Sequence, residues 1–597
     1  MSNMQMQNCL WLMCFLGAAT ALKLKDAADY EVKRDILEER YPAFKSFHGT
    51  MHAGMMPAGI IDNETDDDEF SSYFFWLLRP DVDANDQSAS QFRNDTLLIW
   101  LNGGPGCSSM VGMMGEMGPV GTPKFRPGIP SPNPAPLVEN KYAWTKKTAM
   151  LFVEQPGGVG FSTASKKWTG KKATKRTEED VASSFYAFLQ NVYAVFGDDL
   201  IEKKLYLSGE SYAGMYIPSI AHMIHIQNQN LLNDTSHSGS SLKHINLGGA
   251  AIGNGWIDPK IQGPTTIDYA WWHGMIDLQS YRGLHAKWDE CVNNQILDSS
   301  EKPFHPFTTP DECGISVAVM KASGSAFMYD VTTYDTYPDI LDEGGIVSSF
   351  FNDPAVRESL NAPSIDEHEV WLQCVPGAGR RRRLDNKHNR RELLLLDKDR
   401  PYSVVPYIAA LLDDANVDIL LYNGDLDLAC SSQSTELAIE SMHWSGATAW
   451  MDPNTTKWKQ WMVDGQPAGH VKSYNKLQFV VVYNSGHFVP INQAENALNM
   501  ISRWLDGQSF GDKDLPMFPI FPESTNTLGP PVDEKSPPVV DDSSKTQQHS
   551  YSLLNGLIGF LLGMLTSRIF FRRSASRLSP STSSLQLVSE ETPLRLE

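Results

Sequence analysis

The sequence predicts an α/β fold with a largely parallel sheet that helices cover on both faces. Short, continuous apolar runs recur along the chain, and each ends in a Gly-rich or polar loop. Such runs are typical of parallel strands buried on both faces, and functional loops in these folds follow the carboxyl ends of the strands. Apolar residues make up 41% of the 597 residues, which allows a large core and excludes global disorder.

The chain is acidic, with 50 Lys and Arg against 71 Asp and Glu and a formal net charge of −21. Nucleic acid as the main partner would require clustered positive charge, so this balance argues against it. The charge agrees with a cationic partner or an acidic compartment, although net charge alone mainly concerns solubility.

The first element is a secretory signal peptide, residues 1–21. Cys9 to Ala21 form a short apolar run that ends in Ala19-Thr20-Ala21, an A-x-A pattern that predicts cleavage after Ala21. No Lys or Arg precedes the run, which departs from the usual pattern. The alternative is a buried core helix at the start of the chain.

Three apolar runs in the first half of the chain predict strands that lead into Gly-rich loops. Thr96–Leu101 is followed by Asn-Gly-Gly-Pro-Gly-Cys-Ser-Ser, and Met150–Val153 is followed by Glu-Gln-Pro-Gly-Gly. Leu205–Leu207 leads into Ser-Gly-Glu-Ser-Tyr-Ala-Gly, after which a helix is expected. The last loop has the strand, sharp turn and helix of a nucleophile elbow with Ser211 at its apex, although Ala213 replaces the usual final glycine.

Two later strands carry the other candidate catalytic groups. Asp418–Tyr422 ends in Asn-Gly-Asp-Leu-Asp, and Phe479–Tyr483 ends in Asn-Ser-Gly-His, where the histidine is His487. The chain order Ser, Asp, His is that of α/β-hydrolases, in which the histidine takes the proton of the serine and an acid orients the histidine. Taken singly, an Asp or His after a strand is usually a turn residue, and the residues alone leave the choice between Asp425 and Asp427 open.

Five segments together resemble the landmarks of the serine carboxypeptidase family. They are WLNGGPGCSS, GESYAG, AIGNGWIDP, YNGDLDLAC and SGHFVP, and they occur in the family's order. The likeness runs from about Lys45 to Leu505. The resemblance implies an α/β-hydrolase fold without a metal or organic cofactor, with the triad Ser211, Asp427 and His487. It also implies an oxyanion hole formed by the backbone amides of Gly104 and Tyr212.

An exopeptidase must also bind the free carboxylate of its substrate. The resemblance assigns this task to four residues, namely Asn102, Gly103, Glu116 and Glu210. Closely placed carboxyls cannot all ionise, so they retain protons that are shared as hydrogen bonds. Peptide binding should therefore weaken as pH rises. The alternative for Glu116 is a solvated helix residue. Met110, Met113, Met114 and Met117 either border a substrate pocket or fill the core.

Five cysteines remain after removal of the signal peptide, and an odd number predicts one free thiol. The resemblance implies disulfides Cys107–Cys374 and Cys291–Cys313, with Cys430 free beside the catalytic acid. Cys430 either lines the substrate pocket and makes the enzyme sensitive to mercurials, or is a small buried apolar residue.

The segment from about residue 258 to 397 interrupts the core and is expected to cap the substrate entrance. It contains two basic runs, Arg380–Arg383 and Arg390–Arg391, which the family pattern lacks. One hypothesis is cleavage by a kexin-like protease, giving two disulfide-linked chains. A solvated basic loop is the alternative.

After the catalytic domain (22–508), residues 509–549 are Pro-rich and predict an extended stalk. Residues 550–571 contain the apolar run Tyr551–Phe571 and predict one transmembrane helix. Its C-terminal side is basic, which predicts a cytoplasmic tail at 572–597 and type I topology. Four N-x-[ST] sequons precede this run, as expected for a lumenal region: Asn63, Asn94, Asn233 and Asn454.

With these ends, the whole chain resembles the membrane-anchored fungal members of the family, which trim basic residues left by kexin-type processing. The expected function is removal of C-terminal Lys or Arg from peptides and proproteins at a Golgi or trans-Golgi network membrane. Three alternatives remain: a broad-specificity vacuolar or lysosomal carboxypeptidase, an acyltransferase on the same scaffold, and a non-catalytic peptide-binding protein. The sequence identifies no acidic residue that would select a basic side chain.

Overall fold

The computed structural model describes residues 24–60, 70–81, 92–122, 137–165, 177–233, 242–292, 314–333, 345–368, 370–375 and 402–514. The predicted signal peptide, Asn63, Cys313, the two Arg runs, the stalk after residue 514, the span and the tail lie outside these residues. The stalk was predicted to begin at residue 509, which is too early, because Gly511–Asp514 form a strand of the main sheet. Within the described part, no helix combines the length and apolarity needed to cross a membrane.

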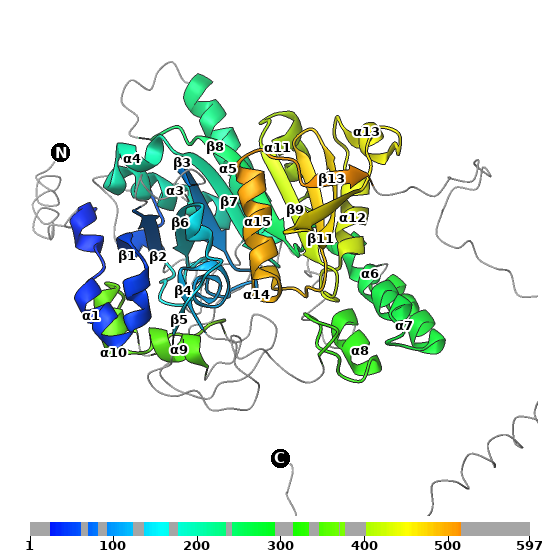
Figure 1. Cartoon of the computed structure of the whole chain (residues 1–597), viewed down its shortest axis with the longest axis horizontal. Coiled ribbons are helices and arrows are strands. Elements are labelled where there is room, and N and C mark those ends of the chain that lie inside the picture. Colours follow the sequence, from blue (N-terminus) through cyan, green and yellow to red (C-terminus); the bar gives the residue numbers. More distant parts are fainter. Residues whose placement is uncertain are drawn as a thin grey trace, which may run out of the picture. The chain divides into compact units, whose positions relative to one another are not determined.

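An eleven-stranded sheet runs through the molecule in the order β1-β2-β6-β3-β7-β8-β9-β12-β11-β10-β13 (Figure 1). Its central strands are parallel. They are β6 (Thr148–Val153), β3 (Arg93–Leu101), β7 (Lys204–Glu210), β8 (Leu247–Gly253), β9 (Asp418–Gly424) and β12 (Leu477–Val482). The predicted parallel sheet is thus confirmed at its centre, and each of the five predicted strands coincides with one of these elements.

Antiparallel strands extend the sheet on both sides and were not predicted. One side carries β1 (Gly49–Pro57) and β2 (Ser72–Pro80), and the other carries β11 (Gln466–Tyr474), β10 (Lys459–Val463) and β13 (Gly511–Asp514). Several of these strands mix polar, glycine and apolar residues because they lie toward the edges, where burial on both faces is not required. A separate two-stranded sheet pairs β4 (Val120–Gly121) with β5 (Val138–Glu139).

Helices cover both faces of the sheet and bury two large apolar clusters. On one face lie α3 (Glu178–Phe196), α5 (Ala213–Asn233), α11 (Val405–Asp413) and α12 (Ser432–Glu440). The other face is covered by α1 (Arg34–Arg40), η2 (Pro42–Ser46), α2 (Met110–Gly112), η4 (Met113–Met117), η5 (Trp144–Lys146), α9 (Ile346–Phe351), α10 (Pro354–Ser359), α14 (Val489–Asn492) and α15 (Ala494–Leu505). Short elements complete the list: η1 (Ala27–Tyr30), α4 (Asp198–Ile201) and α13 (Ala447–Met451).

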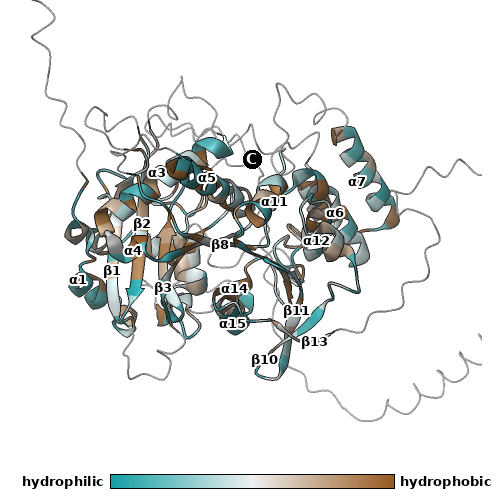
Figure 2. Cartoon of the chain, turned by 90° about the horizontal axis from the view of Figure 1, so that it is seen from above, coloured by the Kyte–Doolittle hydropathy of each residue, from teal (hydrophilic) through white to brown (hydrophobic). Residues whose placement is uncertain are grey.

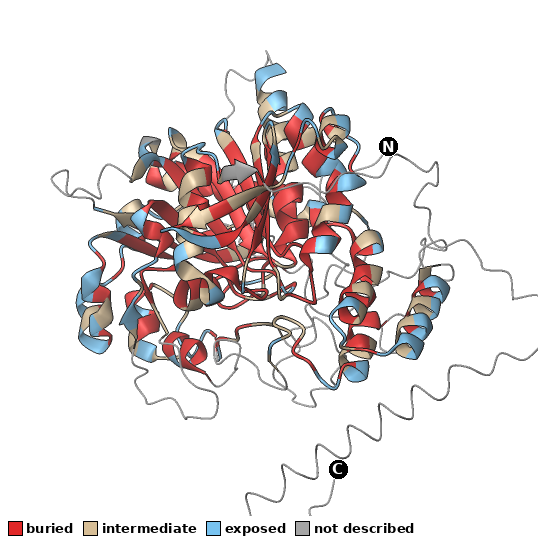
Figure 3. Cartoon of the chain, turned by 45° about the vertical axis from the view of Figure 1, so that its right-hand side comes forward, coloured by how far each residue is buried: buried red, intermediate tan, exposed pale blue. Residues whose placement is uncertain are grey.

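The colouring of the ribbons agrees with this layering. Hydropathy is highest along the central strands, while the outer helices α1 and α7 carry more hydrophilic residues (Figure 2). Buried residues fill the middle of the fold, and exposed residues lie on the outer turns of the helices (Figure 3). The sheet is therefore buried between two layers of helices, and the loops that follow its strands can hold a site.

The insertion between β8 and β9 divides into two parts. Its first helices, α6 (Pro259–Trp272), α7 (Leu278–Cys291) and α8 (Ile315–Ala322), form a small apolar cluster of their own that reaches Leu428 (Figure 1). The later helices, α9 and α10, join the main core beside α1 instead. Only the first part therefore has the arrangement expected of a cap, because α9 and α10 belong to the body of the fold.

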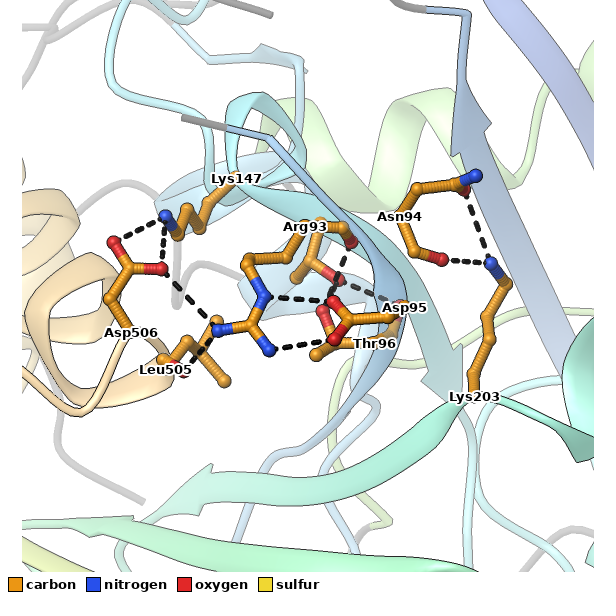
Figure 4. A network of polar contacts seen from close by, with 9 residues as sticks. Arg93, Asn94, Asp95, Thr96, Lys147, Lys203, Leu505 and Asp506 are labelled. Atoms are coloured by element: carbon orange, nitrogen blue, oxygen red, sulfur yellow. Dashed lines mark hydrogen bonds and ion pairs between the residues drawn. The ribbon is translucent and has the colours of Figure 1, made fainter. Parts of the chain in front are cut away.

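A polar network ties the end of α15 to the starts of β3 and β6 (Figure 4). The Arg93 guanidinium donates two hydrogen bonds of 2.8 Å to the Asp95 carboxylate and one of 2.7 Å to the Leu505 carbonyl oxygen. Lys147 donates to Asp506 at 2.7 Å, and its side chain is only 4% exposed. This network lies where β3 and β6 begin, so it fastens the scaffold away from the catalytic loops that follow the strands.

Candidate active site

Ser211 lies at the sharp turn between β7 and α5. Its φ of +62° is in the left-handed region, which side-chain-bearing residues rarely adopt and which marks a strained nucleophile turn. The flanking glycines are required by close packing. A Cβ on Gly209 would lie 2.1 Å from the Leu101 carbonyl oxygen, and one on Gly214 would lie 2.7 Å from the Trp256 nitrogen. The turn therefore presents Ser211 at the carboxyl edge of the sheet.

His487 and Asp427 form a buried pair at the same edge. The Nδ1 atom of His487 lies 2.7 Å from Oδ2 of Asp427, and the two residues are 2% and 0% exposed. An acid bonded to Nδ1 leaves Nε2 free to exchange a proton with a serine. Asp425 has a different role, since it accepts a hydrogen bond from the Ser485 amide at 3.1 Å. The structure thus places Asp427, and not Asp425, on the histidine.

Two residues that were not predicted from the sequence support this pair. Asn254 donates to Oδ2 of Asp427 at 2.7 Å and accepts from the Gly424 amide at 3.2 Å, with a φ of +44°. Tyr329, from the insertion, packs against His487 with the two rings tilted by 35° and their centroids 4.6 Å apart, and its carbonyl oxygen accepts a hydrogen bond from the His487 amide at 2.7 Å. Asn254 could have been suspected, because it lies within the AIGNGWIDP landmark segment, whereas nothing near Tyr329 in the sequence signals its position.

The loop from Asn102 to Gly106 lies against the nucleophile. A Cβ on Gly103 would be 2.4 Å from the Tyr212 nitrogen and 2.8 Å from the Ser211 Cβ, so only glycine allows this approach. Gly104 has a φ of +111°, and the Cys107 amide donates to the Gly103 carbonyl oxygen at 3.1 Å. The structure therefore places Gly103, the neighbour of Gly104, directly against Ser211 and Tyr212.

A disulfide joins Cys107 to Cys374 and connects this loop to residues 371–375. Cys291 is also disulfide-bonded, and its predicted partner, Cys313, lies outside the described residues. Cys430 is free and buried. The idea that cleavage at the Arg runs gives disulfide-linked chains is wrong, because Cys430 is the only cysteine after these runs and has no disulfide.

Two glutamates and an asparagine meet beside the elbow. Asn102 Nδ2 donates to Oε1 of Glu210 at 3.0 Å and lies 3.5 Å from Oε1 of Glu116. Asn102 Oδ1 accepts hydrogen bonds from the Trp100 indole and the Gly112 amide, which fixes the orientation of the side-chain amide. Glu116 and Glu210 are only 4% and 2% exposed, so Glu116 is not a solvated helix residue. The four methionines around Glu116 are buried in the core.

The buried carboxyls retain protons more strongly than ordinary glutamates. Burial raises the pKa of Glu116 to about 7, which donated hydrogen bonds from Asn102 and Glu210 only partly offset. The pKa of Glu210 is raised well above its usual value by burial first and by the charge of Glu116 second. At acidic pH the pair is therefore protonated and can donate hydrogen bonds to an anion.

Three of the four predicted glycosylation asparagines belong to the described residues, and each is exposed: Asn94, Asn233 and Asn454. Asn94 also accepts a hydrogen bond from Lys203 through its side chain at 3.2 Å (Figure 4). The potential ligand atoms of Asp427, Cys430 and His487 lie within 4.8 Å of one another. That group coincides with the acid and base of the site.

The fold is of the α/β-hydrolase type, with Ser211 at a strained turn and a buried Asp–His pair following strands of the same sheet, in the chain order Ser, Asp, His. A serine carboxypeptidase family model matches residues 44–507. The chain therefore belongs to the serine carboxypeptidase family, as its motifs predicted.

Similar proteins include two pheromone-processing carboxypeptidases named KEX1. The one from Saccharomyces cerevisiae (strain JAY291) is 31% identical over 468 residues, which cover 74% of this chain and 58% of that protein. The one from Kluyveromyces lactis is 32% identical over 513 residues, covering 82% and 73%. The chain thus spans under three fifths of the length of the S. cerevisiae relative.

A solved structure is also similar. The crystal structure of KEX1(DELTA)P, a prohormone-processing carboxypeptidase from Saccharomyces cerevisiae, has a TM-score of 0.64 and 28% sequence identity. The match covers 81% of this chain and 97% of that one. The likeness supports the same fold and the same family.

Proposed function

We propose that the protein is a serine-type carboxypeptidase that removes C-terminal residues, preferentially Lys or Arg, from peptides and proproteins. The observation that carries this proposal is the buried group of Asn102, Glu116 and Glu210 next to Ser211. An endopeptidase or esterase has no use for protonated carboxyls at this place, whereas an exopeptidase needs donors for the free carboxylate of its substrate.

Catalysis would proceed through an acyl-enzyme. Ser211 Oγ attacks the carbonyl carbon of the last peptide bond while His487 accepts the hydroxyl proton, and Asp427 stabilises the resulting imidazolium. The amides of Gly104 and Tyr212 donate to the developing oxyanion. His487 then protonates the leaving amine, and a water molecule activated by His487 hydrolyses the acyl-enzyme.

The substrate carboxylate would bind to Asn102, the Gly103 amide, Glu116 and Glu210. Protonated glutamates donate to a carboxylate, while ionised ones repel it. Because the pKa of Glu116 is raised to about 7, binding of peptides with a free C-terminus should weaken as pH rises through neutrality. Substrates without that carboxylate should not show this loss.

The remaining assignments depend on the sequence and the relatives. The predicted signal peptide, stalk, span and tail support a type I protein of a Golgi or trans-Golgi network membrane with a lumenal catalytic domain. The preference for basic residues, and a kexin-like protease acting earlier on the same substrates, are inferred from pheromone-processing relatives. Glycans at Asn63, Asn94, Asn233 and Asn454 and a Cys291–Cys313 disulfide complete the proposal.

The test is an assay of the purified full-length protein in detergent on peptides that differ only in a C-terminal Lys, Arg, Leu or Phe. We expect release of the last residue, fastest for Lys and Arg, and no release by Ser211→Ala. Equal rates on all four peptides would reject the basic preference. Full activity of Ser211→Ala would reject the serine mechanism.

A further inference from the structure

Tyr422 lies in the same row of the sheet as the carboxylate-binding candidates. Glu210 on β7 pairs with Gly253 on β8, and Gly253 pairs with Tyr422 on β9. Paired residues of neighbouring parallel strands project to the same face of a sheet. Tyr422 therefore belongs to the face that carries Glu210, and it is two strands away.

Gly253 lets the tyrosine reach across the strand between them. A Cβ on Gly253 would lie 2.4 Å from Cζ and 2.6 Å from the hydroxyl oxygen of Tyr422. The end of the phenol ring thus occupies the space above Gly253 that a side chain would fill. Because adjacent strands are about 4.8 Å apart, this position brings the hydroxyl beside the side chain of Glu210.

No contact within the fold explains why a hydroxyl group is buried at Tyr422. Tyr422 is 1% exposed, and among the described residues its hydroxyl has no hydrogen-bond partner. Oε2 of Glu116 is buried and unpartnered in the same way. Buried polar atoms nearly always have a partner, often an ordered water. Burial, then the charges of Glu210 and Glu116, raise the pKa of Tyr422, so the phenol stays neutral and keeps its proton.

We propose that Tyr422 is a positioning residue for the carboxylate-binding pair, with its hydroxyl linked to the Glu210 carboxyl through one buried water. This inference rests on the proposed function of Glu116 and Glu210. A phenol donor stabilises the ionised form of a carboxyl and orients its protonated form toward the substrate. Tyr422 would thereby set the pH above which peptides no longer bind.

The test uses Tyr422→Phe, which keeps the ring over Gly253 and removes only the hydroxyl. Tyr206→Phe is the matched control, because Tyr206 is buried on the same face of β7, four residues before Glu210. For each enzyme, kcat and KM are measured from pH 4 to 9 on one peptide with its C-terminus free or amidated.

We expect Tyr422→Phe to raise KM for the free peptide severalfold at pH 5 with kcat nearly unchanged. The alkaline limb of its kcat/KM profile should move up by about one pH unit, the shift that corresponds to one lost hydrogen bond to a charged group. The amidated peptide and Tyr206→Phe should behave as the wild type does. In a Glu210→Gln background, Tyr422→Phe should not move the limb further.

The outcomes separate this inference from the proposed function. Suppose first that the wild type prefers the free peptide. The role of Tyr422 alone would then be overturned by any of three results: no shift of the alkaline limb in Tyr422→Phe, an equal loss of kcat/KM on both peptides, or the same shift in the Glu210→Gln background. Equal wild-type rates on the free and amidated peptides would overturn the proposed function and this inference together.

Discussion

At the scale of single residues, Asp427 has the most complete set of partners in the site. It accepts from Asn254 and from the amides of Ala429 and Cys430, at 2.7, 2.9 and 3.3 Å, and it is paired with His487 at 2.7 Å. Because its burial is complete, each of these donors stabilises its charge. A carboxylate held in this way can keep the histidine in one orientation and one tautomer.

Removing the side chain of Asn254 should therefore impair catalysis more than binding. Glycine also tolerates the positive φ of this position, so Asn254→Gly removes the amide without adding backbone strain. A hydrogen bond to a charged group contributes about 1.5–3 kcal/mol, so we expect kcat to fall roughly ten- to hundredfold while KM stays similar. Steady-state kinetics measure this, with Asn416→Gly, an exposed turn residue with positive φ, as the control. An unchanged kcat would contradict the supporting role of Asn254.

Cys430 should make the enzyme sensitive to mercurials. Its Sγ lies within 4.8 Å of ligand atoms of Asp427 and His487, so a bound mercury would obstruct the histidine. Burial raises the pKa of this thiol well above its usual value, so alkylating reagents that need a thiolate should react slowly. We expect mercurial treatment to abolish activity in the wild type but not in Cys430→Ser. Equal inactivation of both would assign Cys430 to core packing only.

The sequence predicted the chemical groups of the site better than the groups that hold them. Ser211, Asp427 and His487 follow apolar runs, and that placement is a local signal. Asn254 and Tyr329 act through contacts between segments far apart in the chain, and no local pattern reports such contacts. The position of Tyr422 is still harder to predict from the sequence, because its proximity to Glu210 depends on the register of the three strands β7, β8 and β9.

At the scale of structural elements, Glu154 joins the loops around the site. It follows β6, and its carboxylate accepts from the Ser108 hydroxyl at 2.5 Å, the Trp371 indole at 2.7 Å and the Phe161 amide at 2.6 Å. Ser108 lies next to the Cys107–Cys374 disulfide. One fully buried carboxyl thus connects the loop that contains Gly103 and Gly104 with the segment before Cys374.

Because of Glu154, the free energy of unfolding should fall as pH rises. Burial raises the pKa of Glu154 from 4.5 to about 7, so the folded protein holds a proton that the unfolded chain releases. The contribution is present in full below pH 4.5 and is lost as pH rises to 7, by at most about 3 kcal/mol. We expect a lower Tm at pH 7.5 than at pH 5, and a smaller difference in Glu154→Gln. Glu440→Gln, exposed on α12, is the control. An identical pH dependence in both variants would contradict this account.

The strands also differ in how well local sequence patterns predict them. Continuous apolar runs predicted β3, β6, β7, β9 and β12, because a strand covered on both faces must be apolar throughout. β8 was missed because its residues, Leu-Gly-Gly-Ala-Ala-Ile-Gly, are small and rich in glycine. Those glycines are needed where large neighbours cross the strand, as Tyr422 does at Gly253.

At the scale of the whole molecule, the insertion separates the nucleophile from its partners in sequence. Ser211 precedes it, while Asp427 and His487 follow it, and the pairing of β8 with β9 brings the two parts together. Cleavage at the Arg runs would therefore leave a triad divided between two chains. The parallel sheet and its two apolar clusters would hold these chains without a disulfide.

If the protein purified from its native host is cleaved there, two bands should appear on gels both with and without reducing agent. The two pieces should nevertheless elute together in size-exclusion chromatography under native conditions and retain activity. A single band on reducing gels would refute cleavage. Two bands that merge into one without reducing agent would contradict the observed state of Cys430.

The most direct test of the central claim is mass spectrometry of the products from one peptide ending in Arg, supplied as the free acid and as the amide. The account predicts loss of the single C-terminal Arg from the free acid at pH 5, a much slower reaction at pH 8 and with the amide, and none with Ser211→Ala. Internal fragments, or equal rates for both peptides at both pH values, would contradict a carboxypeptidase that binds the free carboxylate through Glu116 and Glu210.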